Sequence, residues 1–307
     1  MNNFIEHPLY GKDNADSAIS ALWIFYKKHF PFLFIVSLIL SLITSYVSAG
    51  MDMNEIQSVT DPQEILLKMK EYIWPMLIIS VISLFFSTIL HYYVIYYPLD
   101  SQSSIIKCCA KSLRYFIPYL IMVVLLSFFG SFLLALGLIA LVIGIFLAAL
   151  YIFMIYLFIL PVLMAEGPLI ANAIVRIFRL AHKKFWANLG WTAVFGVVLI
   201  IISVFLSGII LVPFSGTFLK TLSDPQNAVN AAELASNPLY IILSAMASAL
   251  TFPVLPVFAC ILYFRAIAEE EKSFYNFPVT DEDENEGRIK VEDLYAKPKE
   301  EDDNTDK

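Results

Sequence analysis

The chain has 307 residues, of which 59% are hydrophobic and 15% charged, and its mean hydropathy is +0.73. Soluble domains carry about 25% charged residues, so this composition excludes a soluble globular protein and indicates an integral membrane protein. The net charge of −7 comes from the C-terminal tail, because residues 1–265 carry 14 Lys/Arg and 12 Asp/Glu whereas residues 266–307 carry 6 and 15.

The N-terminal region is expected to lie at the membrane surface. Residues 1–16 form a polar lead, and the pattern from Ala18 to Phe30 predicts an amphipathic helix. This helix ends in Lys27-Lys28 and carries aromatic residues of the kind that gather at membrane interfaces. Pro31 then opens the first spanning segment.

A second amphipathic helix is expected after Pro98, where the second span has ended. Its polar residues recur at spacings of three and four, which places them on one helical face. They are Ser104, Lys107, Lys111 and Arg114.

The stretch from Phe116 to Ala165 holds fifty residues without a single charge. As one helix it would measure about 75 Å, against a hydrocarbon core of about 30 Å. We therefore expect two spans, joined by a tight turn between Gly137 and Gly144.

A third surface helix is expected after Glu166-Gly167-Pro168, which breaks the chain because Gly is permissive and Pro lacks an N–H. Pro168 suits the first position of the new helix. Polar residues spaced four, three and four apart share one face of it: Asn172, Arg176, Arg179 and Lys183. A helix with apolar residues opposite such a basic stripe lies at a membrane surface.

Together these patterns predict an all-α, polytopic integral membrane protein with six transmembrane helices. The spans are expected at residues 31–49, 73–97, 117–137, 143–164, 189–213 and 239–264. The repeated junctions YKKHFPFLF, KSLRYFIPY and HKKFWANLG indicate three hairpins, each preceded by a cytoplasmic amphipathic surface helix. The membrane domain covers residues 17–265, and the acidic tail 266–307 lacks the apolar content to fold, so we expect it to be disordered.

Basic residues set the orientation of a membrane protein. Seventeen of the twenty Lys/Arg fall in the N-terminal segment, the 98–115 and 166–186 loops and the tail. Only Lys68, Lys70 and Lys220 fall in the other connections. Both termini are therefore expected to be cytoplasmic.

Residues 161–186 follow a pattern of proline, acid, alanine, arginine, leucine and aromatic residues. The positions are Pro161, Glu166, Ala173, Arg176, Leu180, Phe185 and Trp186. The pattern resembles the membrane domain that precedes the catalytic domain of some bacterial glycerophosphodiester phosphodiesterases, and the related YciC-like six-span proteins. That family has a serine after the arginine, where this chain has Ile177.

The resemblance implies a protein of the bacterial cytoplasmic (inner) membrane that is tied to envelope or lipid metabolism. The phosphodiesterase activity does not carry over to this chain. A TIM barrel needs about 250 residues, whereas the longest soluble segment here is the tail of about 42.

Basic residues on the expected cytoplasmic face are the candidates for lipid binding. They are Arg176, Arg179, Lys183, Lys184, Lys107, Lys111 and Arg114, together with Lys27 and Lys28. Such residues control topology and attract anionic lipid at about 1 kcal/mol each. The alternative is a defined site for a phosphorylated headgroup, which the bidentate fork of Arg suits better than Lys.

Four residues are candidates for a transport path. Glu166 is either a carboxylate favoured by the helix start that follows and paired with Arg176, or a proton-coupled group. His91 lies well inside an apolar span, either as a structural hydrogen-bonding group or as a proton relay. Pro253 and Pro256 predict a kink in the sixth span, which either lines a cavity or is structural.

We therefore expect a non-enzymatic membrane protein that binds anionic lipid at its cytoplasmic face and scaffolds a protein partner through its acidic tail. The alternative is a small transporter or lipid-handling permease that uses the kinked sixth span, His91 and Glu166. The four histidines are scattered and the adjacent Cys108-Cys109 suit a zinc site poorly, so we expect no metal and no cofactor. No nucleic-acid partner is expected.

Overall fold

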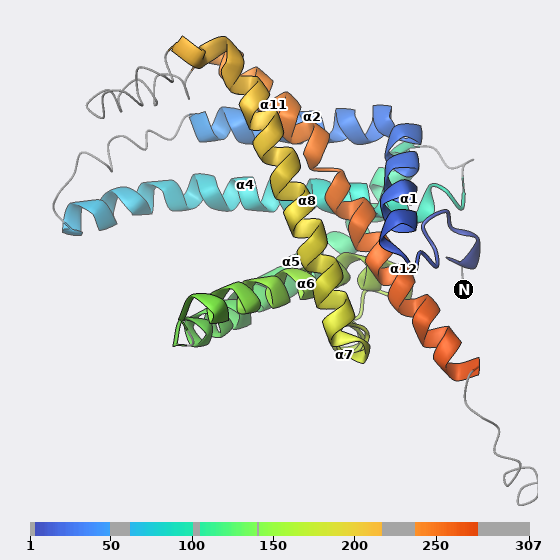
Figure 1. The fold of residues 1–307 in the computed structure, drawn as a ribbon. Helices are drawn as coiled ribbons and strands as arrows, with labels where there is room; N and C mark the ends of the chain where they lie inside the picture. Colours follow the sequence, from blue (N-terminus) through green and yellow to red (C-terminus); the bar gives the residue numbers. More distant parts are fainter. Residues whose placement is uncertain (1–3, 50–61, 101–104, 140, 217–236, 276–307) are drawn as a thin grey trace, which may run out of the picture. The chain divides into compact units, whose positions relative to one another are not determined.

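The computed structural model describes residues 4–49, 62–100, 105–139, 141–216 and 237–275. The chain divides into two units, Met1–Ala268 and Glu269–Lys307. The described residues fold into helices joined by short turns, with no strand among them (Figure 1).

The helices follow one another with few residues between them. They are η1 (Phe4–Glu6), α1 (Ala15–Lys28), α2 (Phe30–Ala49), α4 (Pro62–Tyr96), α5 (Ile105–Ile139), α6 (Leu141–Glu166), α7 (Ile170–Lys183), α8 (Phe185–Leu211), η2 (Val212–Phe214), α11 (Pro238–Thr251) and α12 (Val254–Tyr275).

Six stretches of the described chain are long and apolar enough to cross a bilayer. They are Phe30–Ser48, Met69–Tyr96, Ile105–Ile139, Val142–Glu166, Phe185–Phe214 and Pro238–Lys272. The prediction of an all-helical, multi-pass membrane protein is therefore confirmed, and each stretch overlaps one of the six expected spans.

Two expected helix boundaries are absent. The surface helix after Pro98 and the third span form the single helix α5, because nothing between Ile105 and Phe116 interrupts its backbone hydrogen bonds. The second span likewise begins far earlier than residue 73, as part of the 35-residue helix α4. Charged residues alone do not end a helix, so they gave a poor estimate of these boundaries.

The sixth span shows the opposite difference. It is divided into α11 and α12, and the chain between Thr251 and Val254 is a turn that contains the buried Pro253. Beyond the span, α12 continues to Tyr275, so the first ten residues of the expected disordered tail are helical. The remainder of the tail, residues 276–307, lies outside the described residues.

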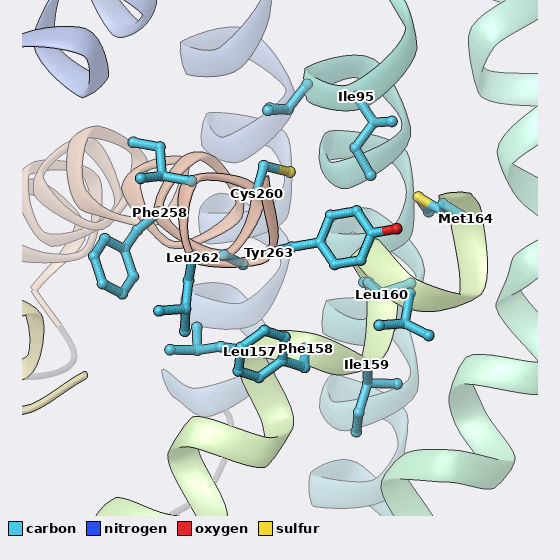
Figure 2. Packing of buried hydrophobic residues seen from close by; sticks show 14 of the residues in the cluster. Ile95, Leu157, Phe158, Ile159, Leu160, Met164, Phe258, Cys260, Leu262 and Tyr263 are labelled. Atoms are coloured by element: carbon cyan, nitrogen blue, oxygen red, sulfur yellow. The ribbon is translucent and has the colours of Figure 1, made fainter. Parts of the chain in front are cut away.

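The hydrophobic core gathers around the first half of α12. Every side chain from Val257 to Phe264 is at most 5% exposed, so this helix is enclosed on all sides. Figure 2 shows Tyr263 of α12 lying between Ile95 of α4 and Leu160 of α6. We call this cluster, formed by α12 with the C-terminal parts of α4 and α6 and the N-terminal part of α8, the packed end.

Away from the packed end, the spans expose their apolar side chains. Phe128 of α5, Val142 of α6 and Phe205 of α8 are all more than 60% exposed. In water such a surface would be unstable, but the hydrocarbon of a bilayer accepts it. The core is therefore concentrated at one end of the spans, and lipid covers much of the remaining apolar surface.

The turn between α5 and α6 lies where the sequence places it, and two glycines bring these helices together. A Cβ added to Gly137 would lie 2.7 Å from the carbonyl oxygen of Gly144 and 3.2 Å from the Cβ of Ala148. Small residues at such a contact let two membrane helices pack by van der Waals forces.

The first 16 residues are more than a polar lead. His7 and Leu9 are 3% and 0% exposed, and the His7 ring lies 4.6 Å from the ring of Phe264 on α12. The Leu9 N–H donates to Nδ1 of His7 at 3.1 Å, so the opposite nitrogen, Nε2, carries the proton and donates to the Val94 carbonyl at 3.0 Å. The N-terminal segment therefore packs against the packed end.

We expect Gly137→Ala to destabilise the protein. Overpacking a tight core contact costs about 1–3 kcal/mol, of which the better helix propensity of Ala returns up to about 1 kcal/mol. Gly190→Ala is the matched control, because a Cβ there meets no atom within 4 Å. Denaturant unfolding in detergent micelles measures both variants. A loss as large in Gly190→Ala would contradict the close approach.

The stability of the protein should fall as the pH drops below 6.5. Burial lowers the pKa of His7 from 6.5 to about 4, and the nearby His29 lowers it further, while the bond to Val94 opposes both. The unfolded chain therefore takes up a proton before the folded protein does, which removes up to roughly 3 kcal/mol between pH 6.5 and 4. Burial and the charge of Lys28 lower the pKa of His29 in the same direction.

The unfolding midpoint measured from pH 7 to pH 4.5 tests this expectation. His7→Gln cannot titrate, so its midpoint should fall less steeply than that of the wild type. His182 is exposed, and His182→Gln serves as the control. Parallel curves for His7→Gln and the wild type would show that His7 is not the cause.

Candidate functional site

The candidate site lies at the junction between α6 and α7. α6 ends at Glu166, and Gly167 adopts a φ of +116°, which L side chains rarely tolerate. The break therefore occurs at the predicted residues. The new helix, however, begins at Ile170 with Leu169 as its N-cap, two residues later than the expected start at Pro168.

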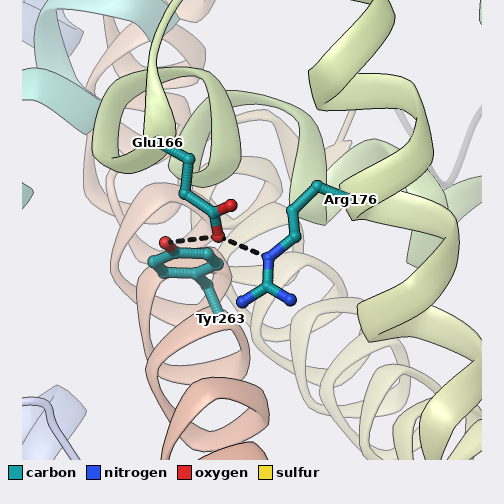
Figure 3. Close-up of polar contacts among 3 residues, drawn as sticks. All are labelled: Glu166, Arg176 and Tyr263. Carbon is teal, nitrogen blue, oxygen red and sulfur yellow. Dashed lines mark hydrogen bonds and ion pairs between the residues drawn. The ribbon is translucent and has the colours of Figure 1, made fainter.

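A carboxylate at this junction holds three helices together. Oε1 of Glu166 accepts a hydrogen bond from Nε of Arg176 on α7 at 2.8 Å and another from the hydroxyl of Tyr263 on α12 at 3.2 Å (Figure 3). The side chains of Arg176 and Glu166 are 20% and 33% exposed, so the ion pair lies at the edge of the packed end. We call these three residues the junction triad.

Polar contacts around the triad fix the ends of the neighbouring helices. The hydroxyl of Tyr96, on α4, donates to the carbonyl of Met164 near the end of α6. The side-chain amide of Asn188, on α8, donates to the carbonyls of Leu180 and Ala181 at 3.0 and 3.1 Å. These carbonyls belong to the last turns of α7, which otherwise lack intrahelical partners.

The two faces of α7 differ sharply. Ala173, Ile177, Leu180 and Ala181 are buried against the packed end. The other face exposes basic residues next to apolar ones: Arg179, Lys183, Val175 and Phe178, followed by Lys184 and Trp186 beyond the helix. We call this second surface the exposed α7 face.

The remaining lipid-binding candidates are also at the surface. Lys107, Lys111 and Arg114 of α5 and Lys27 and Lys28 of α1 are exposed. Arg176 is the exception among the candidates, since its guanidinium is engaged by Glu166. The geometry therefore separates one basic residue with a structural partner from a larger set that faces outward.

The transport-path candidates are not brought together around one cavity. His91 is 3% exposed, and its Nδ1 donates to the carbonyl of Ser87 one turn earlier at 2.8 Å. Pro253 and Pro256 are both buried. None of these residues, nor Glu166, lines any of the three cavities found among the described residues.

The break in the sixth span is satisfied by another helix. The N–H of Phe252 donates to the Ser248 carbonyl at 2.9 Å, but Pro253 has no N–H to continue the ladder. The hydroxyl of Tyr26, on α1, donates to the carbonyl of Leu250 at 3.0 Å. Burial raises the pKa of Tyr26 to about 12, so this hydroxyl keeps its proton at neutral pH.

Sequence analysis missed Tyr263 and Arg265. Arg265 is 5% exposed, and its guanidinium carbon lies 4.8 Å from the ring centroid of Trp191, a cation–π contact. The available signal was the order Tyr263-Phe264-Arg265 at the end of an apolar span, which is typical of an interface anchor. The contact partners lie 97 and 74 residues away in the chain, and the local pattern does not reveal them.

Within the described residues, no group of three or more His, Cys, Asp or Glu could hold a metal ion. The free cysteines Cys108 and Cys260 are buried, and Cys109 is half-buried. The junction triad therefore offers charge and hydrogen bonds for positioning helices, with one carboxylate, one guanidinium and one phenol.

No protein-family model, curated protein or solved structure matches this chain. The resemblance of residues 161–186 to the glycerophosphodiester phosphodiesterase membrane domains therefore stays a prediction.

Removing the Tyr263 hydroxyl should weaken the junction triad. A hydrogen bond to a charged group is worth about 1.5–3 kcal/mol when buried, and we expect about 1–2 kcal/mol for Tyr263→Phe at this partly exposed site. Tyr46→Phe is the matched control, because Tyr46 is 79% exposed. Unfolding in detergent micelles measures both changes.

A double-mutant cycle with Glu166→Gln identifies the partner. Because both residues share one contact, their coupling energy should be about 1 kcal/mol, whereas independent sites add within about 0.5 kcal/mol. Additive effects of Tyr263→Phe and Glu166→Gln would contradict the triad.

Proposed function

We propose that the protein is a non-enzymatic membrane protein that binds anionic lipid through the exposed α7 face. The observation that carries this function is the mixture of Arg179, Lys183 and Lys184 with the exposed Phe178 and Trp186 on one surface. A surface helix with apolar and aromatic residues among basic ones is suited to the headgroup region, where both kinds of side chain are stabilised.

The rigidity of α7 supports this function. The buried apolar face and the Glu166–Arg176 ion pair hold the helix, so its outward side chains keep a fixed direction. Binding then costs less conformational entropy than it would for a flexible basic loop. Each basic residue near an anionic surface contributes about 1 kcal/mol.

We infer the orientation and finer architecture from charge. The basic residues of α1, the start of α5 and α7 would face the cytoplasm, with both termini on the same side. The spans would then form three hairpins, each preceded by a helix at the cytoplasmic surface. The burial of one α7 face and the exposure of its basic face support this placement for the third unit.

We also infer membership of the YciC-like family and a place in the bacterial inner membrane. The two charged residues of the resembling pattern, Glu166 and Arg176, are hydrogen-bonded to each other. Ala173 and Leu180 of the same pattern are 3% and 1% exposed. The pattern thus describes a junction between helices, which favours an anchoring and scaffolding role over chemistry.

A small transporter or permease is the second candidate, favoured by the break between α11 and α12. Discontinuous helices form the binding sites of many transporters. Here, however, the Leu250 carbonyl at the break is bonded to Tyr26, and Glu166 is bonded to Arg176 and Tyr263. Those contacts leave anionic-lipid binding as the better-supported function.

Neutralising one residue of the exposed α7 face should weaken binding to phosphatidylglycerol. A loss of about 1 kcal/mol for Arg179→Gln corresponds to about fivefold in affinity, and salt should reduce the difference. Lys70→Gln is the matched control, since it removes one exposed positive charge that lies outside the expected cytoplasmic face.

Titration of phosphatidylglycerol into the purified protein in detergent, at low and high salt, measures these affinities. Phosphatidylcholine should bind weakly to the wild type and to both variants. An equal loss in Arg179→Gln and Lys70→Gln, or no loss in either, would contradict a lipid-binding face on α7.

A further inference from the structure

An apolar groove of about 570 Å³ lies between α1, α8 and the break that separates α11 from α12. Its volume is within the range of about 300–1,000 Å³ that ligand pockets occupy. Its walls come from one face of each helix, and almost all of them are apolar. Representative residues are Ile19, Leu22, Val194, Val198, Ile202 and Phe258.

The length of the groove matches one leaflet of a bilayer. The α8 wall runs from Val194 to Leu206, which is about 18 Å of helix. Half of a hydrocarbon core of about 30 Å is about 15 Å. Since α8 is one of the six spanning stretches, the surrounding medium is lipid hydrocarbon and the groove is open to an acyl chain.

The groove presents little to a polar ligand. The rings of Phe195 and Phe258 stack in its wall with centroids 3.7 Å apart. The Leu250 carbonyl, released near the break, already accepts the hydrogen bond from Tyr26. An acyl chain is therefore a better occupant than a polar solute, because it asks for no hydrogen bonds from these walls.

A cation stands at the edge of this apolar surface. Lys27 lines the groove, and its Nζ lies 5.3 Å from the ring centroid of Trp23, which also lines it. Lys27 is exposed, in the last turn of α1. A lysine and a tryptophan beside a hydrocarbon-filled groove suit a negatively charged headgroup at the membrane interface.

We propose that this groove binds one acyl chain of an anionic phospholipid, with the phosphate of the headgroup at Lys27. The site rests on the membrane placement proposed above but uses no residue of the exposed α7 face. It would hold a single lipid whose chain is recognised by shape and whose charge is recognised by one lysine. The protein would then retain this lipid after detergent has removed the surrounding bilayer.

Native mass spectrometry of the detergent-purified protein, titrated with dioleoylphosphatidylglycerol, tests the site. The wild type should hold one lipid, and dihexanoylphosphatidylglycerol should bind at least tenfold more weakly because it buries fewer methylene groups. Val198→Phe should fill the groove and lower the affinity at least tenfold. Val204→Phe is the matched control, because Val204 is 66% exposed on α8 and does not line the groove.

Two further variants sharpen the test. Ile202→Phe fills the same groove and replaces Val198→Phe if that protein does not fold. Lys27→Gln should keep the chain-length dependence but reduce the preference for phosphatidylglycerol over phosphatidylcholine about fivefold.

The outcomes separate this site from the exposed α7 face. Loss of the lipid in Val198→Phe with retention in Arg179→Gln supports the groove, whatever the fate of the α7 face. Unchanged binding in both Val198→Phe and Ile202→Phe, or equal affinity for the short-chain lipid, would overturn the groove even if Arg179→Gln weakens binding.

Discussion

Enclosure of the first half of α12 is the constraint on which the structure of the membrane unit depends. Val257 to Phe264 are buried on every side, so no face of this helix is left for lipid. In a bilayer the hydrophobic effect does not drive helices together, and association rests on packing and hydrogen bonds. Small residues at Ala259 and Cys260 leave room for close neighbours, and the Tyr263 hydroxyl supplies a bond to Glu166.

That packing determines how α7 is presented. Because Tyr263 comes from the enclosed helix, the Glu166 carboxylate that it contacts is held at a fixed point, and Arg176 follows through the ion pair. The apolar face of α7 then lies against the core. Its basic residues are left outward, at the level where charged headgroups are expected. Core packing and surface charge are therefore linked through one carboxylate.

Much of this organisation could be predicted from the sequence. Hydropathy located six spans because lipid requires long apolar stretches, and Glu166-Gly167-Pro168 marked the end of α6. Charge was a poor guide to helix ends, as α5 shows by running unbroken past Lys107, Lys111 and Arg114. The roles of Tyr263, of Arg265 and of the N-terminal His7 depend on contacts across the fold, which no local pattern encodes.

The central claim is that the packed end and the basic face of α7 lie together on the cytoplasmic side. Labelling of single introduced cysteines with an impermeant maleimide tests it directly, in a Cys109→Ala background because Cys109 is half-buried. Arg179→Cys and Lys107→Cys should react in inside-out vesicles and not in intact cells, and Lys70→Cys should do the reverse. Reaction of all three positions from the same side of the membrane would contradict the proposed topology, and with it the lipid-binding face.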